Sequence, residues 1–128
     1  MLRFFIIAMG GAVGTLFRYA LSGFDRKVSN GIFPINTLIV NLIGSLIIGF
    51  FWGLFEHLSV SSHAKTFIFI GILGGFTTFS AFSLESFNLF RDGEFKIALL
   101  NIGITNILGI LLVFIGFVIS KYMVNFLK

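Results

Sequence analysis

Long apolar runs separated by short charged connectors are the main pattern along the chain. Four runs hold about 20 predominantly apolar residues each, the length needed to cross the hydrocarbon core of a bilayer. They cover residues 4–22, 36–55, 66–90 and 97–120. Most of the charged residues lie between them, in the segments FDRKVSNGIFP, EHLSVSSHAK and RDGEFK. The pattern predicts an all-α membrane protein in which residues 1–128 form a single domain of four transmembrane helices.

The composition supports a membrane protein and excludes several other classes. The chain is 57% hydrophobic and 11% charged, whereas soluble domains average about 25% charged residues. It has no cysteine, so disulfides, thiol nucleophiles and cysteine-bound metals are excluded. The nine lysines and arginines are scattered, without the basic stripe expected of a nucleic-acid-binding protein. The first apolar run continues through Leu21, too long for the core of a secretory signal, so we expect an uncleaved span.

The cations are divided equally between the two faces of the membrane. With four spans, both termini and the second connector share one face, and the first and third connectors share the other. The cations are Arg3, Lys65, Lys121 and Lys128 on the first face, and Arg26, Lys27, Arg91 and Lys96 on the second. Equal counts leave the positive-inside rule without a preferred orientation. Chance in a small protein is one interpretation; we favour insertion in both orientations and an antiparallel homodimer.

Small and polar residues recur every four positions within the spans. The second span carries Thr37, Asn41 and Ser45 at this spacing, continued by Gly49 and Gly53. Further repeats are Gly10 and Gly14 in the first span, Gly71 and Gly75 in the third, and Asn101, Thr105 and Gly109 in the fourth. Because small residues four apart let helix backbones approach closely, we interpret the glycines as packing surfaces.

Three polar side chains inside the spans need partners. Serine and threonine can bond a carbonyl of their own helix. An asparagine amide cannot satisfy all of its groups that way, so Asn41 at mid-span needs either a protein partner or a solute and is a candidate functional residue. Arg18 is the only cation within an apolar run, and Glu85 is the corresponding acid in the third span. We expect structural roles for both, and the alternative is an electrostatic contribution to the access of an anion.

The segment GGFTTFSAF, residues 74–82, is an unusual mixture for the middle of a span. Gly74 and Gly75 predict a local break in the third helix, which would free backbone carbonyls. Freed carbonyls suit a small desolvated cation such as Na⁺. Phe79 and Phe82 are three apart, so both rings can lie on one face, and their positive edges can line a path for an anion. The alternative is that both are ordinary packing residues among nineteen phenylalanines.

Three segments of the spans form a specific combination. They are GGAVGTLFRY in the first span, NTLIVNLIGSLIIG in the second and GGFTTFSAFSLE in the third. Together they resemble the Fluc (CrcB) family of small bacterial fluoride channels. The resemblance covers all four spans in order, and a TTFSxF core after a double glycine is specific for so small a membrane protein.

The resemblance implies passive, fluoride-selective conduction across the bacterial cytoplasmic (inner) membrane, which relieves fluoride toxicity by export. It implies two parallel pores, each built from both subunits of an antiparallel dual-topology homodimer in the lipid bilayer. Phe79 and Phe82 would contact fluoride with their ring edges, and Asn41 would bond the ion or hold a ring in place. Ser80 and Thr105 would supply hydroxyls that replace the hydration shell of fluoride.

The resemblance also implies a structural Na⁺ at the dimer centre, which is not transported. The backbone carbonyls of Gly74 and Thr77 would bind it. The fourth span departs from the family pattern. Similar proteins often carry a tyrosine and two small hydroxyl residues where this chain has Asn101, Thr105 and Gly109. The polar track is therefore altered at both ends, and no role is assigned to Asn101 or Gly109.

Other functions fit the residues less well. A small proton-coupled multidrug exporter is the main alternative, and it requires a titratable group at the membrane centre. Glu85 is the only carboxylate within the spans, and it lies well past the middle of the third. A non-transporting assembly subunit would leave the hydroxyl-rich third span without a purpose. An enzyme is not expected, because the residues offer no nucleophile–base pair and no cluster of metal ligands.

Overall fold

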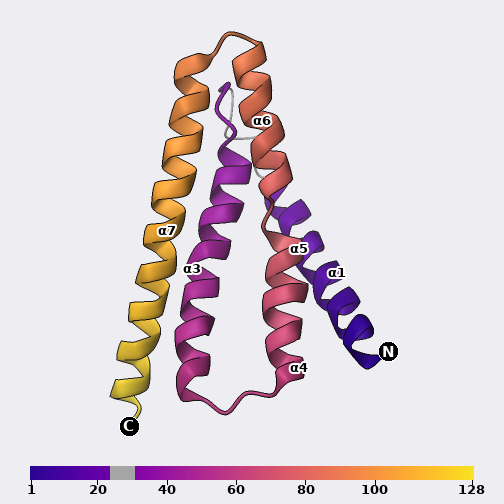
Figure 1. Cartoon of the computed structure of the whole chain (residues 1–128), viewed down its shortest axis with the longest axis vertical. Coiled ribbons are helices and arrows are strands. Elements are labelled where there is room, and N and C mark those ends of the chain that lie inside the picture. The colour runs from indigo at the N-terminus through magenta and orange to yellow at the C-terminus, as the bar shows by residue number, and fades with distance from the viewer. Residues whose placement is uncertain (24–30) are drawn as a thin grey trace.

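Four long apolar helices make up the part of the chain that the structure describes. The structure is a computed structural model, and it describes residues 1–23 and 31–128. Each of the four helical spans in this part is long and apolar enough to cross a membrane, as predicted. The elements are α1 (Leu2–Ser22), α3 (Ile35–His57), α4 (Ser62–Lys65), the π-helical η1 (Thr66–Leu73), α5 (Gly74–Phe76), α6 (Phe79–Arg91) and α7 (Phe95–Phe126) (Figure 1).

The third span is interrupted, but not where its glycines predict. Elements α4, η1 and α5 form its first half and α6 its second. Gly74 and Gly75 are helical, and the chain becomes extended at Thr77 (ψ 158°) and Thr78 (φ −149°, ψ 118°). The predicted break in the third helix is therefore confirmed, but it lies about three residues after the double glycine. The physical reason is that the Thr77 amide keeps its helical bond to the Leu73 carbonyl (3.0 Å), whereas the Asn41 side chain replaces the helical bond of the Thr78 amide.

The spans begin and end at residues suited to those positions. Pro34 directly precedes α3, where the fixed φ of proline is compatible with a helix start and its missing N–H costs nothing. The Ser61 hydroxyl accepts a hydrogen bond from the Ala64 amide (3.2 Å) and so caps α4. Gly93 adopts a positive φ of 82° in the tight turn between α6 and α7. These local signals determine the connector positions and therefore the lengths of the spans.

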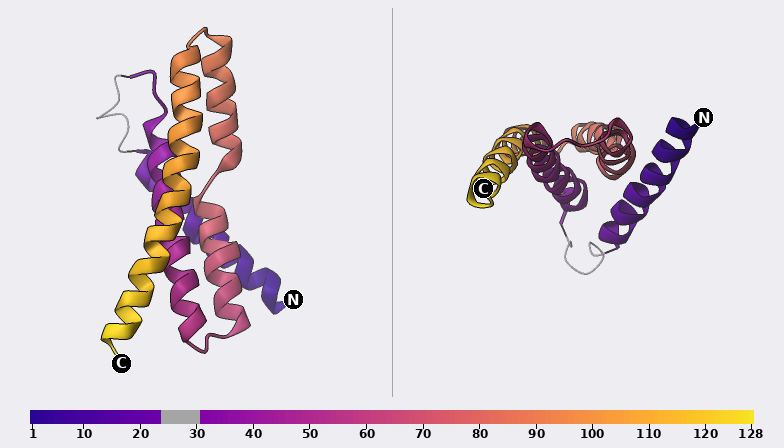
Figure 2. Two further views of the ribbon diagram at one scale, coloured as in Figure 1. Left: turned by 60° about the vertical axis from the view of Figure 1, so that its left-hand side comes forward. Right: turned by 90° about the horizontal axis from the view of Figure 1, so that it is seen from below.

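The helices pack in an order that differs from their order in sequence. α3 lies along α7, α1 packs against η1 and α5, and α6 packs against the first part of α7. α1 and α7 lie on opposite sides of the molecule (Figures 1 and 2). Both termini lie toward the end that carries the connector between α3 and α4 (Figure 1). Arg3 donates a hydrogen bond to Ser62 Oγ (3.4 Å) at this end, which is the arrangement expected of four spans.

The equal charge count rests partly on residues that the structure does not describe. Arg26 and Lys27 lie outside the described residues. Arg91 and Lys96 flank the turn between α6 and α7, at the opposite end from Lys65. The described cations therefore agree with the predicted division between two faces.

Glycines allow the close helix contacts, as predicted from their spacing. A methyl group on Gly10 would lie 2.8 Å from Gly71 Cα and from the Phe67 carbonyl oxygen. A methyl group on Gly75 would lie 2.6 Å from the Gly11 carbonyl oxygen, and one on Gly49 would overlap the Val113 carbonyl. These positions are in contact with backbone, which cannot move aside as a side chain can. The glycines join α1 to the third span and α3 to α7.

The enclosed core is small, and long apolar faces remain open. On α7, for example, Ile110 is 72% exposed and Phe114 is 65% exposed. Hydrocarbon, unlike water, accepts such a surface without cost. The described apolar side chains that are buried are Val40, Leu73, Phe76, Phe82, Leu89, Ala98 and Val124.

Candidate functional site

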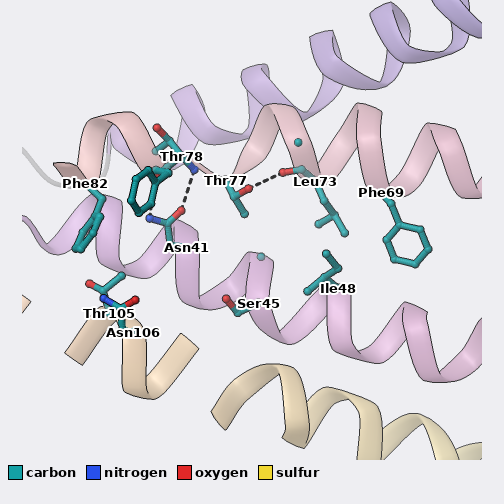
Figure 3. A pocket seen from close by; sticks show the side chains of 13 residues that line it. Asn41, Ser45, Ile48, Phe69, Leu73, Thr77, Thr78, Phe82, Thr105 and Asn106 are labelled. Atoms are coloured by element: carbon teal, nitrogen blue, oxygen red, sulfur yellow. Dashed lines mark hydrogen bonds between the residues drawn. The ribbon is translucent and has the colours of Figure 1, made fainter. Parts of the chain in front are cut away.

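The break in the third span is held open by side-chain hydrogen bonds. The Asn41 Nδ2 group donates to the Thr78 carbonyl oxygen (2.9 Å). The Thr78 amide donates to Asn41 Oδ1 (2.9 Å), the bond that Figure 3 marks between these residues. The Thr78 hydroxyl in turn accepts from the Ala81 amide (3.2 Å) and caps the start of α6. One asparagine on α3 therefore satisfies both backbone groups of a residue that has left the helix. The sequence predicts that Asn41 needs a partner or a solute, and the Thr78 backbone is that partner; a contact of Asn41 with an ion stays a prediction.

Two carbonyls at the break lose the amides that a continuous helix would give them. In a regular α-helix, the Thr78 amide would bond the Gly74 carbonyl, and the Ala81 amide would bond the Thr77 carbonyl. Both amides instead donate to side-chain oxygens. Open space lies beside Gly74, where an added methyl group would meet nothing closer than the Phe69 carbonyl oxygen at 3.8 Å. Carbonyl oxygens are ligands that a hard cation such as Na⁺ accepts, so these residues fit a cation of that kind.

A cavity of about 350 Å³ lies beside the break, between α3, the third span and α7 (Figure 3). It brings together six of the residues for which a role in binding fluoride or Na⁺ is expected from the sequence. None of the described residues that line it carries a formal charge. The lining residues are Asn41, Gly44, Ser45, Ile48, Phe69, Leu73, Gly74, Thr77, Thr78, Phe79, Phe82, Thr105 and Asn106.

The two phenylalanines of the motif form a ring pair in the wall of this cavity. Their ring centroids are 5.7 Å apart and the ring planes are inclined by 47°. The predicted placement of both rings on one helical face is therefore confirmed. Their surroundings differ, because Phe82 is 8% exposed and Phe79 is 78% exposed. The Phe82 ring is packed within the chain, whereas the Phe79 ring is largely exposed on the surface of the single chain.

Ser80 and Arg18 lie in a second cavity of about 530 Å³, beside α1. Thr78 lines both cavities, and its hydroxyl lies 3.4 Å from Ser80 Oγ. The hydroxyls of Thr78 and Ser80 thus lie between the second cavity, which the Arg18 side chain lines, and the first cavity, whose described lining residues carry no formal charge. The residues that line the second cavity are Thr15, Arg18, Tyr19, Ser22, Asn36, Thr37, Val40, Thr78, Ser80, Ala81 and Leu84.

Glu85 has a partner that the sequence did not reveal. Thr37 Oγ1 donates to Glu85 Oε1 at 2.6 Å, which joins α3 to α6. Thr37 is 9% exposed, so the bond lies largely within the protein. The polar stripe of the second span contained the signal, since Thr37 is one turn before Asn41. Its pairing with Glu85, 48 positions away, depends on how the two helices pack.

The fourth span contributes one predicted residue to the first cavity. Thr105 lines it, whereas Asn101 is 1% exposed and is not among its lining residues. Gly109 leaves room for Ser45, whose Oγ would lie 3.5 Å from an added methyl group. The three residues of the altered polar track therefore face different surroundings.

The sequence comparisons identify the family. Residues 5–117 match the family model described as "CrcB-like protein, Camphor Resistance (CrcB)". The chain belongs to the CrcB family. A relative from Parabacteroides distasonis is 41% identical over 128 residues, which is all of both chains. One from Aquifex aeolicus is 43% identical over 91% of this chain and 95% of its own, and one from Pyrococcus furiosus is 42% identical over 91% and 94%. Each of the three CrcB relatives is named a fluoride-specific ion channel, FluC.

Proposed function

We propose that this CrcB protein is a fluoride-specific ion channel that lets fluoride leave the cell passively through the cytoplasmic membrane. The cavity beside the break is the observation that carries the proposal. It combines a ring pair, threonine hydroxyls and an amide, without a formal charge among its described lining residues. The names of the relatives supply the identity of the ion.

This chemistry suits a small, strongly hydrated anion. Removing an isolated ion from water costs on the order of tens of kcal/mol, so several replacement partners must act together. The hydroxyls of Thr78 and Thr105 and the positive edges of Phe79 and Phe82 provide such partners. A lysine or arginine in the same place would hold the anion too tightly to let it leave. Arg18, in the neighbouring cavity, attracts anions from a distance without binding them in the path.

Two features support an antiparallel homodimer as the working unit. The Phe79 ring is 78% exposed beside the candidate path, so a second copy would complete the wall around it. Apart from Arg18, the lysines and arginines of the sequence are divided equally between the two ends of the spans, which agrees with insertion in both orientations. Each path would then be lined by residues of both subunits.

The same proposal includes a structural Na⁺ held by the carbonyls of Gly74 and Thr77. Support comes from the two amides that bond side chains instead of these carbonyls. When bound, the cation supplies a positive potential that favours an anion passing nearby. Two copies related by a twofold axis would supply a pair of carbonyls each.

Ion efflux from liposomes tests the proposed function. The purified protein is reconstituted into vesicles loaded with potassium fluoride or potassium chloride, and efflux is started with a potassium ionophore. We expect rapid loss of fluoride and no measurable loss of chloride. Equal passage of both ions, or none of either, would overturn the proposal. Fluoride efflux that requires a proton gradient would instead favour a coupled exporter.

A further inference from the structure

A chain of three hydrogen bonds connects two walls of the cavity through Asn101. Thr105 Oγ1 lies 3.4 Å from Asn101 Oδ1, Asn101 Nδ2 lies 3.1 Å from Ser86 Oγ, and Ser86 Oγ lies 2.8 Å from the Phe82 carbonyl oxygen. Thr105 and Phe82 both line the cavity, on α7 and α6 respectively. Asn101 is 1% exposed and Ser86 is 6% exposed, so water does not compete for the bonds between them.

The number of available protons fixes the direction of every bond in this chain. Ser86 has one hydroxyl proton, and the Phe82 carbonyl can only accept, so that proton goes to Phe82. Ser86 must therefore accept from Asn101, and the atom facing it must be Nδ2. Asn101 Oδ1 then faces Thr105, and because this oxygen is only an acceptor, Thr105 donates. The Thr105 proton is thus held by Asn101 beside the cavity.

We propose that Asn101 is a positioning residue of the ion path. Its Oδ1 accepts the Thr105 hydroxyl proton while no anion is present, and its Nδ2 connects this hydroxyl, through Ser86, to the backbone of Phe82. The inference rests on the proposed function, and it assigns a role to a position at which the fourth span departs from the pattern of similar proteins.

The lengths of these hydrogen bonds indicate how Asn101 positions the Thr105 hydroxyl. At 3.4 Å, the Thr105–Asn101 contact is long compared with about 2.7–2.8 Å for a typical hydroxyl–oxygen bond. A weak bond is exchanged at little cost, so the Thr105 proton can turn from Asn101 Oδ1 to an arriving anion and return when the anion leaves. The Asn101–Ser86 and Ser86–Phe82 bonds are shorter and buried, so they keep the amide from turning with it. Asn101 does not contact the ion and acts only through Thr105 and Ser86.

Coupling between substitutions separates this role from simple packing. Asn101→Leu is close in volume and removes both bonds, and we expect it to lower fluoride efflux about tenfold. In a Thr105→Val background, Asn101→Leu should lower fluoride efflux only about twofold or less, because the hydroxyl proton that Asn101 positions is already absent. If Asn101 served only packing, it would cost the same factor in both backgrounds. Ser120→Ala is the control, and it should leave efflux near the original rate. It removes a fully buried hydroxyl of the same helix, and within the described part of the chain this hydroxyl bonds only the Phe117 carbonyl.

A second pair keeps Asn101 in place and covers the case in which Asn101→Leu does not fold. Ser86→Ala and Thr105→Val change opposite ends of the amide, and their combined loss of efflux should be clearly smaller than the product of the single losses. The inference would be overturned if the loss of efflux in the double variant equalled the product of the two single losses. Unchanged efflux in Asn101→Leu would also overturn it. If the unaltered protein passes fluoride, such a result leaves the proposed function intact. Absence of fluoride efflux from the unaltered protein would overturn the proposed function first and this inference with it.

Discussion

Asn41 binds the backbone of Thr78 through two hydrogen bonds of 2.9 Å, one in each direction. A side chain on α3 therefore takes the place of the helical hydrogen bonds that the third span gives up. This relationship fixes the position of the break. It also makes Asn41 part of the wall of the candidate ion path rather than a side chain whose groups are all free for the ion.

Removing the Asn41 amide should destabilise the protein and lower its fluoride conduction. Asn41→Leu leaves a donor and an acceptor of Thr78 without partners, and we expect a loss of about 2–4 kcal/mol in unfolding free energy. Asn106→Leu is the matched control for stability, because among the described residues Asn106 bonds only the Ile102 carbonyl of its own helix (2.7 Å). Thermal unfolding in detergent measures both changes, and a similar loss in the two variants would contradict the role of Asn41. Fluoride efflux should fall in Asn41→Leu even at temperatures where it remains folded.

The two rings of the cavity should affect conduction alike but stability differently. Phe79→Ile and Phe82→Ile each remove a ring edge, and we expect fluoride efflux to fall about tenfold or more in each. Because Phe82 is buried and Phe79 is largely exposed in the single chain, Phe82→Ile should destabilise the chain more. Phe87→Ile, on the exposed side of the same helix, is the control for both measurements. Unchanged efflux in both ring variants would show that the rings only pack.

The bond between Thr37 and Glu85 should contribute measurably to stability. Thr37→Val keeps the shape of the side chain and removes its donor, and the expected loss is about 1–3 kcal/mol in unfolding free energy, because a buried acceptor loses its partner. The loss should be smaller in a Glu85→Gln background, since an amide oxygen is a weaker acceptor than a carboxylate. Thermal unfolding of the two single variants and the double variant measures this difference. Equal costs of Thr37→Val in both backgrounds would argue against the bond.

Single cysteines can test the proposed dual topology, because the chain has no cysteine of its own. Ser59→Cys places a thiol in the connector between α3 and α4, and Asp92→Cys places one in the turn at the opposite end. With equal numbers of chains in each orientation, an impermeant maleimide added to intact cells should label about half of each variant. Complete labelling of one and none of the other would show a single orientation. Permeabilised cells, in which both should react fully, are the control.

Much of the fold follows from the sequence because it depends on local properties. The length of the apolar runs determines four spans, and the positions of Pro34 and Gly93 determine where spans start and turn. Glycines four apart predict close helix contacts, and the contact of Gly10 with Gly71 is one of them. The spacing of Phe79 and Phe82 places both rings on one face whatever the rest of the chain does.

The tertiary structure alone decided which groups satisfy one another. Gly74 and Gly75 are the residues most able to leave a helix, yet the break lies at Thr77 and Thr78, because Asn41 is in place to bond the freed backbone there. The bonds of Thr37 to Glu85 and of Asn101 to Ser86 likewise join residues on different helices. Periodicity shows which side chains share a face of one helix, but not which residues of another helix that face contacts. These contacts depend on the packing of the whole chain. They bring polar residues that are far apart in sequence together along a candidate path for an ion.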